Sequence, residues 1–185
     1  MRKIAIIGLS ALAAFGLACS SGSGGTASSV GGGNAQAVKT ATPEKTTTTA
    51  TVGQTVTLTR DSLGQKTTVE VTVANATQYA KEPGDYGSKP EHGVFVVLDV
   101  TVVCKEGTYS ANPFNFKLVA KDGTVSEGAF TAGFKPALHV TELAAGQKVA
   151  GKIAFDVPKA ALAGGRIQID GIGFDYDKPA AYWAL

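Results

Sequence analysis

The feature of the sequence that most constrains the fold is an alternation of apolar and polar residues, which recurs from about residue 52 to the C-terminus. Successive side chains of a β-strand point to opposite faces, so a period of two residues is typical of strands that bury one face. The segments with this period are Thr55–Thr59, Val69–Val73, Val94–Cys104, Phe114–Leu118, Val149–Val157 and Ile167–Ile169. No segment has the pattern of a three-turn helix, so we expect an all-β fold.

Individual segments add detail to this expectation. Val94–Cys104 is apolar on both of its faces, which predicts a central strand. The pair Asp122-Gly123 predicts a tight hairpin turn into a strand near Val125, and Leu138–Val140 is expected to begin another strand. The apolar positions change parity at Gly171, which predicts a β-bulge there.

Strands of this length and spacing favour one architecture. We expect seven or eight of them in an antiparallel, immunoglobulin-like β-sandwich over residues 52–185, with a small barrel as the alternative. Antibody domains pack a tryptophan against a disulfide between their sheets. Neither hallmark is expected here, because Trp183 lies among the last three residues and the domain has one cysteine. The prediction therefore concerns architecture alone.

The first 18 residues have the composition of a signal peptide. Arg2 and Lys3 precede 15 uncharged residues, from Ile4 to Ala18. As a helix this stretch would span about 22 Å, which is less than the roughly 30 Å hydrocarbon core of a bilayer. We therefore expect residues 1–18 to be a signal peptide rather than a permanent transmembrane helix.

The string Phe15-Gly16-Leu17-Ala18-Cys19 resembles the lipobox of bacterial lipoproteins, although Gly16 and Leu17 depart from its commonest form. The resemblance implies that Cys19 becomes the first residue of the mature chain and that its sulfur carries a diacylglycerol. Two acyl chains suffice for stable anchoring in a membrane. Cys19 is thus the expected lipid attachment site, and the expected location is the outer face of the bacterial cytoplasmic membrane, on the cell surface.

Residues 19–51 are rich in Gly, Ser and Thr and almost free of large apolar side chains. Such a segment cannot bury enough surface to offset the entropy lost on ordering. We expect a lipidated, disordered tether. A flexible chain of about 32 residues has a root-mean-square reach of roughly 30 Å, so the tether would hold the domain close to the bilayer.

Charge and cysteine content narrow the function classes. The chain has 17 Lys and Arg against 15 Asp and Glu, and without Arg2 and Lys3 both counts are 15. A nearly neutral chain without a basic run offers few phosphate contacts, so we expect no nucleic-acid partner. Lipidation of Cys19 would leave Cys104 without a disulfide partner. Cys104 shares a strand face with five aliphatic residues, so we expect it to be buried as a small hydrophobic side chain.

The remaining reactive side chains form no recognisable catalytic or metal-binding motif. His92 and His139 are far apart in the sequence and are expected to be exposed, which is not a zinc pattern. Asp170, Asp175 and Asp177 do not have the spacing of a calcium loop, and we interpret them as solvated acids at a strand end. We therefore expect no catalytic residue, no metal site and no cofactor.

Two segments are candidates for binding. The loop Lys81–Gly93 is the longest connection between expected strands, and Tyr86 in this loop is a candidate aromatic contact. A solvated connection is the alternative. The second candidate is the aromatic tail Tyr176, Tyr182 and Trp183, which would otherwise simply cover one end of the sandwich.

The order of several strand and turn segments resembles a known family. These segments are Gly53–Val56, Val94–Val102, Phe116–Val119, Asp122-Gly123, Leu143–Gly151 and Phe155–Pro158. Together they resemble the telokin-like, immunoglobulin-like domain of bacterial lipoproteins known as domain of unknown function 4352, which is related in fold to secreted mycobacterial immunogenic antigens. The resemblance covers nearly all of residues 52–175 and implies a β-sandwich. It brings no catalytic residues to this chain.

These observations lead to a hypothesis on function. The anchor, the tether and the lack of a catalytic motif favour a non-enzymatic module of the cell envelope that contacts a protein or a ligand. The alternative is a small-molecule carrier with an apolar pocket between the two sheets. An enzyme would instead require polar residues gathered around His92 or His139.

Overall fold

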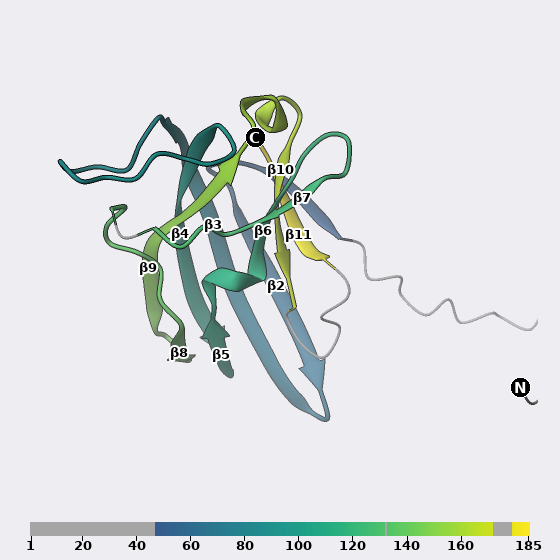
Figure 1. Ribbon diagram of the computed structural model, residues 1–185. Helices are drawn as coiled ribbons and strands as arrows, with labels where there is room; N and C mark the ends of the chain where they lie inside the picture. Colours follow the sequence, from purple (N-terminus) through teal and green to yellow (C-terminus); the bar gives the residue numbers. More distant parts are fainter. Residues whose placement is uncertain (1–46, 132, 172–178) are drawn as a thin grey trace, which may run out of the picture. The chain divides into compact units, whose positions relative to one another are not determined.

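The protein is represented by a computed structural model, which describes residues 47–131, 133–171 and 179–185 (Figure 1). The predicted signal peptide, Cys19 and residues 20–46 of the predicted tether lie outside these ranges, as do Asp175, Tyr176 and Asp177. Within the described ranges, no helix is both long enough and apolar enough to cross a membrane.

The described residues form eleven β-strands and two short 3₁₀ helices. The strands are β1 Thr48–Thr51, β2 Thr55–Ser62, β3 Gln65–Tyr79, β4 Val94–Glu106, β5 Thr108–Ala111, β6 Phe116–Val119, β7 Val125–Glu127, β8 Thr141–Ala144, β9 Lys148–Val157, β10 Arg166–Asp170 and β11 Pro179–Ala184. The 3₁₀ helices are η1 Pro113–Asn115 and η2 Lys159–Leu162. The count exceeds seven or eight because several strands have only three or four residues, too few for an alternation to be recognised.

The strands form two main sheets (Figure 1). One has the order β2-β3-β4-β9 and the other β1-β11-β10-β6-β7, while β5 and β8 form a separate pair. All strand pairs are antiparallel except β1 with β11. The prediction of an all-β, antiparallel sandwich is confirmed. The barrel alternative is wrong, because the two main sheets do not join into one closed sheet.

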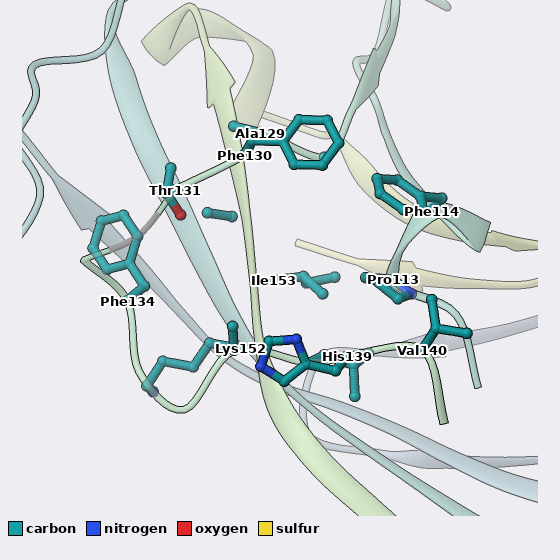
Figure 2. Close-up of a pocket in the computed structure, with 14 residues that line it drawn as sticks. Pro113, Phe114, Ala129, Phe130, Thr131, Phe134, His139, Val140, Lys152 and Ile153 are labelled. Atoms are coloured by element: carbon teal, nitrogen blue, oxygen red, sulfur yellow. The ribbon is translucent and has the colours of Figure 1, made fainter. Parts of the chain in front are cut away.

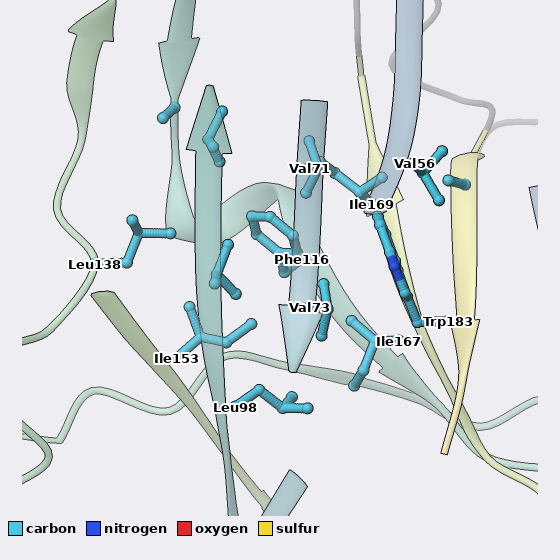
Figure 3. Close-up of a cluster of buried hydrophobic side chains, with 14 of the residues drawn as sticks. Val56, Val71, Val73, Leu98, Phe116, Leu138, Ile153, Ile167, Ile169 and Trp183 are labelled. Carbon is cyan, nitrogen blue, oxygen red and sulfur yellow. The ribbon is translucent and has the colours of Figure 1, made fainter. Parts of the chain in front are cut away.

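The main hydrophobic core lies between the two large sheets (Figure 3). Val71 and Val73 of β3 and Leu98 of β4 face Ile167 of β10 and Trp183 of β11, and all five side chains are fully buried. Each buried aliphatic side chain contributes about 1.5–3 kcal/mol relative to exposure. This shared core is the interaction that holds the sheets face to face.

Strand β4 is central, as predicted, because it pairs with β3 on one side and β9 on the other. Its second apolar face is also covered. Phe95 and Val97 pack with Phe134 and Ala154 in a second buried cluster, separate from the main core. The apolar residues on both faces of β4 are therefore explained by two different packing partners.

The placement of Trp183 corrects the sequence analysis. Trp183 is not part of a cover over the sandwich end but lies fully buried in β11, and its Nε1–H donates a 2.9 Å hydrogen bond to the carbonyl oxygen of Gln54. The reason is that β11 pairs with β10 on one side and β1 on the other, so its alternate residues face the core. Tyr182 points the other way, where the Arg166 guanidinium lies 4.2 Å from its ring centroid.

The ordered domain begins before residue 52. Strand β1 occupies Thr48–Thr51, which the sequence analysis assigned to the tether. The pairing of β1 with β11 uses backbone hydrogen bonds and needs few apolar side chains, and threonine favours the extended conformation. Alternation therefore could not reveal this strand.

The structure tests three local predictions, namely one turn, one β-bulge and one strand. Asp122-Gly123 forms the expected turn between β6 and β7, and Gly123 adopts the positive φ of 91° that such turns require. The register between β10 and β11 shifts between Ile169 and Asp170, one residue before the predicted bulge at Gly171. The strand expected from Leu138–Val140 starts later, at Thr141, because residues 137–138 follow the edge of β9 instead.

Trp183 provides a test of this fold. Replacement of Trp183 by Phe removes the hydrogen bond to Gln54 and leaves a cavity in the core, so we expect the free energy of unfolding to fall by about 2 kcal/mol or more. Urea denaturation followed by circular dichroism measures this loss. The matched control is Tyr182→Phe on the same strand, which should change stability by less than about 1 kcal/mol. Equal effects of the two variants would contradict the placement of Trp183 in the core.

Candidate functional site

The main candidate site is an apolar pocket beside β9, the edge strand of the four-stranded sheet (Figure 2). We call it the edge pocket. Its volume is about 270 Å³. It is lined by Pro113, Phe114, Gly128–Thr131, Phe134, Ala137–Val140 and Lys152–Ala154. In Figure 2, Ile153 of β9 lies in the middle of the labelled side chains, which come from η1, from β9 and from the chain between β7 and β8.

Residues 128–140, which we call the crossing segment, build most of the edge pocket. The segment is attached to β9 by backbone hydrogen bonds at both of its ends. The Ala129 N–H donates to the Ala154 carbonyl at 2.7 Å, and the Leu138 N–H donates to the Lys152 carbonyl at 2.9 Å. The Lys152 N–H donates to the Pro136 carbonyl at 2.7 Å. These bonds cover backbone groups that an edge strand otherwise leaves unpaired.

An aromatic cluster fixes the middle of the crossing segment. The Phe134 ring centroid lies 5.7 Å from that of Phe95 and 5.0 Å from that of Tyr79, in tilted or edge-on arrangements. Such geometries are favourable for aromatic pairs. Phe134 is buried, so the segment is anchored by an apolar side chain between its two hydrogen-bonded ends.

The rim of the edge pocket exposes apolar side chains. Phe114, Phe130 and Val140 are 52%, 89% and 57% exposed. They are half of the six large apolar residues that are exposed among the described residues. The rings of Phe114 and Phe130 lie 5.3 Å apart. Grouped apolar exposure of this kind is typical of a surface that contacts another molecule.

Local sequence explains why Phe114 reaches the rim. Pro113 opens η1, and the Asn112 side chain accepts a 2.9 Å hydrogen bond from the Phe114 N–H. This cap stabilises the short 3₁₀ turn, since proline suits the first position and Asn suits the cap. The turn holds the Phe114 ring outside the core while Phe116, two residues later, is buried inside it.

The charged groups next to the edge pocket are paired with each other. The Lys152 ammonium forms an ion pair with Asp99 of β4, and the Asn75 amide donates a 2.9 Å hydrogen bond to the same carboxylate. The hydrogen bond from Lys152, followed by that from Asn75, lowers the pKa of Asp99 below its ordinary value of 3.8. Lys152 therefore directs its charge to Asp99, and the pocket remains mainly apolar.

The structure separates the two histidines. His139 lines the edge pocket, whereas the His92 Nδ1 atom lies 3.4 Å from an oxygen of Asp156 at a different place in the fold. Both are exposed, as predicted. In the described ranges, no three His, Cys, Asp or Glu side chains come together in a group suited to a metal ion.

Cys104 and Asp170, which the sequence analysis considered as reactive residues, have structural roles. Cys104 is fully buried, as predicted, and its Sγ atom lies 3.5 Å from the carbonyl oxygens of Glu106 and Gly107. Asp170 forms a 2.8 Å ion pair with Lys117, which raises the pKa of that lysine.

The loop Lys81–Gly93 has no regular secondary structure, and Tyr86 in it is fully exposed. Its C-terminal end is fixed by Asp156, whose carboxylate accepts hydrogen bonds from the backbone N–H groups of Glu91 at 2.6 Å and His92 at 3.0 Å.

The edge pocket was not predicted from the sequence. Phe114 was assigned to a strand, and Phe130 and Phe134 were not recognised as site residues. The available signal was a run of aromatic residues spaced among glycines in a stretch without alternation, Gly128–Phe134. Such a stretch has to be explained either by burial or by contact with another molecule.

Gly151 tests how the edge pocket is built. A Cβ atom at Gly151 would lie 2.5 Å from the Leu138 Cα and 2.7 Å from the Ala137 carbonyl carbon, so Gly151→Ala should push the crossing segment off β9. We expect a loss of about 2–3 kcal/mol in the free energy of unfolding, measured by urea denaturation. The control is Gly128→Ala, whose Cβ would meet only the Ala154 oxygen at 3.8 Å and should change stability by less than about 0.5 kcal/mol. Similar stability of both variants would contradict the close packing at Gly151.

Comparison with known proteins places this fold. The chain is similar to the secreted protein MPT63 of Mycobacterium tuberculosis, with 19% identity and a TM-score of 0.59 over 77% of this chain and all of MPT63. It is also similar to the yjhA protein of Bacillus subtilis, with 19% identity and a TM-score of 0.52 over 65% of this chain and 81% of that protein. At this identity the likeness concerns the fold.

No curated protein matches the chain in sequence. Residues 63–178 match the family described as domain of unknown function, DUF4352. This match spans more than half of the chain and agrees with the order of strands and turns described above. The chain therefore belongs to the DUF4352 family.

Proposed function

We propose that the protein is a lipid-anchored, non-enzymatic contact module of the bacterial cell envelope, whose edge pocket receives an apolar side chain of a partner protein. The observation that carries this proposal is the rim of Phe114, Phe130 and Val140 around an apolar pocket. Exposure of these side chains to water is unfavourable, and a partner that covers them recovers that free energy.

The size of the edge pocket favours a side chain over a free ligand. Pockets for drug-sized molecules usually measure about 300–1,000 Å³ and enclose most of the ligand. The edge pocket measures about 270 Å³ and has an exposed rim, which suits one aromatic or branched aliphatic anchor of an interface. The small-molecule carrier, our alternative, calls for a pocket between the sheets. The core cluster occupies that space (Figure 3).

The sequence supports the location. Arg2, Lys3, the apolar stretch and Cys19 have the order of a lipoprotein signal, and the Gly, Ser and Thr-rich tether follows directly. A diacylglycerol on Cys19 would hold the domain at the outer face of the cytoplasmic membrane. A domain of similar fold occurs in the secreted protein MPT63, which is compatible with work outside the cytosol.

The anchor is tested by mass spectrometry of the protein isolated from membranes of its native host. We expect the mature chain to begin at Cys19 and to carry the mass of a diacylglycerol, and we expect Cys19→Ala to leave the membrane fraction. An unmodified Cys19 in the membrane-bound wild-type protein would refute the proposed location.

The contact function is tested by a photo-crosslinking amino acid at position 130. Because Phe130 is 89% exposed at the rim, we expect a crosslink to one defined envelope protein in living cells. Leu63, which is 99% exposed in the turn between β2 and β3, is the matched control and should give none. Substitution of Phe114 by Ala should weaken the crosslink from position 130. Equal crosslinking from both positions, or a product with lipid or a small molecule alone, would contradict the proposal.

A further inference from the structure

A second pocket lies on the other side of Phe130. We call it the acidic pocket, and its volume is about 660 Å³. It is lined by parts of the loop Lys81–Gly93, by Phe95 of β4, by Thr124, Ser126, Glu127 and 129–131, and by Asp156 and Pro158. Ala129, Phe130 and Thr131 line both pockets, so the two sites share one wall. Neither the family nor the edge pocket accounts for this second site.

One lining residue has a carboxylate that the fold does not satisfy. Glu82 is only 9% exposed, yet its side chain makes no hydrogen bond or ion pair with any part of the chain that the structure describes. A buried carboxylate normally has a cation or several N–H donors beside it, because removal from water without a partner is costly. Neither Glu82 carboxylate oxygen is fully enclosed, so the carboxylate keeps contact with solvent and is open to a positively charged group from outside.

The backbone around Glu82 is shaped to hold its side chain in place. A Cβ atom at Gly133 would lie 2.8 Å from the Glu82 Cβ and 3.0 Å from its Oε2. A Cβ atom at Gly87 would lie 3.1 Å from the Glu82 Cβ. A larger residue at Gly133 would therefore meet the Glu82 side chain, whereas at Gly87 a Cβ atom would first meet the Glu82 backbone oxygen, at 2.1 Å.

The other charges of the acidic pocket also favour a cation. Its lining contains four carboxylates, those of Glu82, Glu91, Glu127 and Asp156, against the ammonium of Lys89 and the imidazole of His92. Asp156 is already occupied by the backbone N–H groups of Glu91 and His92. Glu82 is mostly buried, and its carboxylate has no partner among the described residues, so it is the expected centre of binding.

The apolar walls determine which cation fits. Phe95 and Phe130 line the same pocket as Glu82, and Phe130 is the exposed one, at 89% against 4% for Phe95. A guanidinium group is planar and is less strongly hydrated than an ammonium group. It pairs with a carboxylate through two N–H groups and stacks on aromatic rings. We infer that the acidic pocket binds the guanidinium group of an arginine side chain, with Glu82 as its ion-pair partner and the exposed ring of Phe130 beside it.

The inference is tested by titration of small probes, followed by NMR of backbone amides. The protein is the chain from Ser20, which retains the whole compact unit of residues 43–185. The probes are Nα-acetyl-arginine amide and its uncharged isostere Nα-acetyl-citrulline amide. We expect saturable shifts at Gly87, His92 and Gly133 with the arginine probe, and binding about tenfold weaker or more with the citrulline probe. Equal binding of the two probes would overturn the inference without the use of any variant.

A variant of Glu82 gives the second readout. Glu82→Gln keeps the shape of the side chain and removes its charge, so we expect about tenfold weaker binding of the arginine probe or more. Because the carboxylate has no partner in the fold, the melting temperature should stay unchanged or rise. The matched control, Glu142→Gln at an exposed position of β8, should leave binding unchanged. Unchanged binding by Glu82→Gln, or a lowered melting temperature, would contradict the assignment.

A third probe distinguishes an arginine side chain from a free polyamine. Spermidine carries ammonium groups and no guanidinium, so we expect weaker binding than for the arginine probe under equal salt conditions. If spermidine bound more tightly than the arginine probe, and if Glu82→Gln abolished that binding, the pocket would be a polyamine site and the arginine assignment would be wrong. These titrations use no envelope partner, so their outcome does not depend on the proposed contact through the edge pocket.

Discussion

The structure depends on the need to remove both faces of β4 from water. One face of this strand packs into the core between the sheets, and the other presents Phe95 and Val97 to the outside of the four-stranded sheet. A strand with one uncovered apolar face would be an aggregation site. The crossing segment resolves this problem, since it places Phe134 over Phe95 and attaches its ends to the edge of β9. The crossing segment thus both covers the outer face of β4 and pairs with the edge of β9.

This solution also generates the two candidate sites. The crossing segment is fixed by hydrogen bonds near Ala129 and Leu138 and by the buried ring of Phe134. Phe130 belongs to neither buried cluster and remains exposed, and it lines both pockets. One pocket is apolar and the other acidic. A partner segment with an apolar residue close to an arginine would satisfy both.

The regular part of the fold was largely readable from the sequence, whereas the sites were not. Alternation reveals a strand when its two faces differ, as in Thr55–Thr59, or when a run is apolar throughout, as in Val94–Cys104. Strand β1 lacked this signal because its partner, β11, supplies the apolar residues. Trp183 was misplaced for a related reason: its burial depends on sheet neighbours more than a hundred residues away in sequence, at Gln54 and β1.

The pockets escaped prediction because their walls come from distant segments. Phe114, Phe130 and Ile153 share no motif and meet only after the crossing segment has folded against β9. Glu82 carries still less signal, since nothing in its loop distinguishes it from Glu91. Its burial follows from the position of Gly133, which no local pattern determines. Sequence reasoning did identify the loop Lys81–Gly93 as a binding candidate, although through Tyr86 rather than Glu82.

The burial of Cys104 has a kinetic consequence. Its sulfur is fully enclosed and directed at two carbonyl oxygens, so a thiol reagent reaches it only when β4 separates from its neighbours. The rate at which this thiol reacts is therefore set by how often the sandwich opens. Any substitution that loosens the domain would therefore change the reaction rate of this one buried sulfur, without an introduced cysteine.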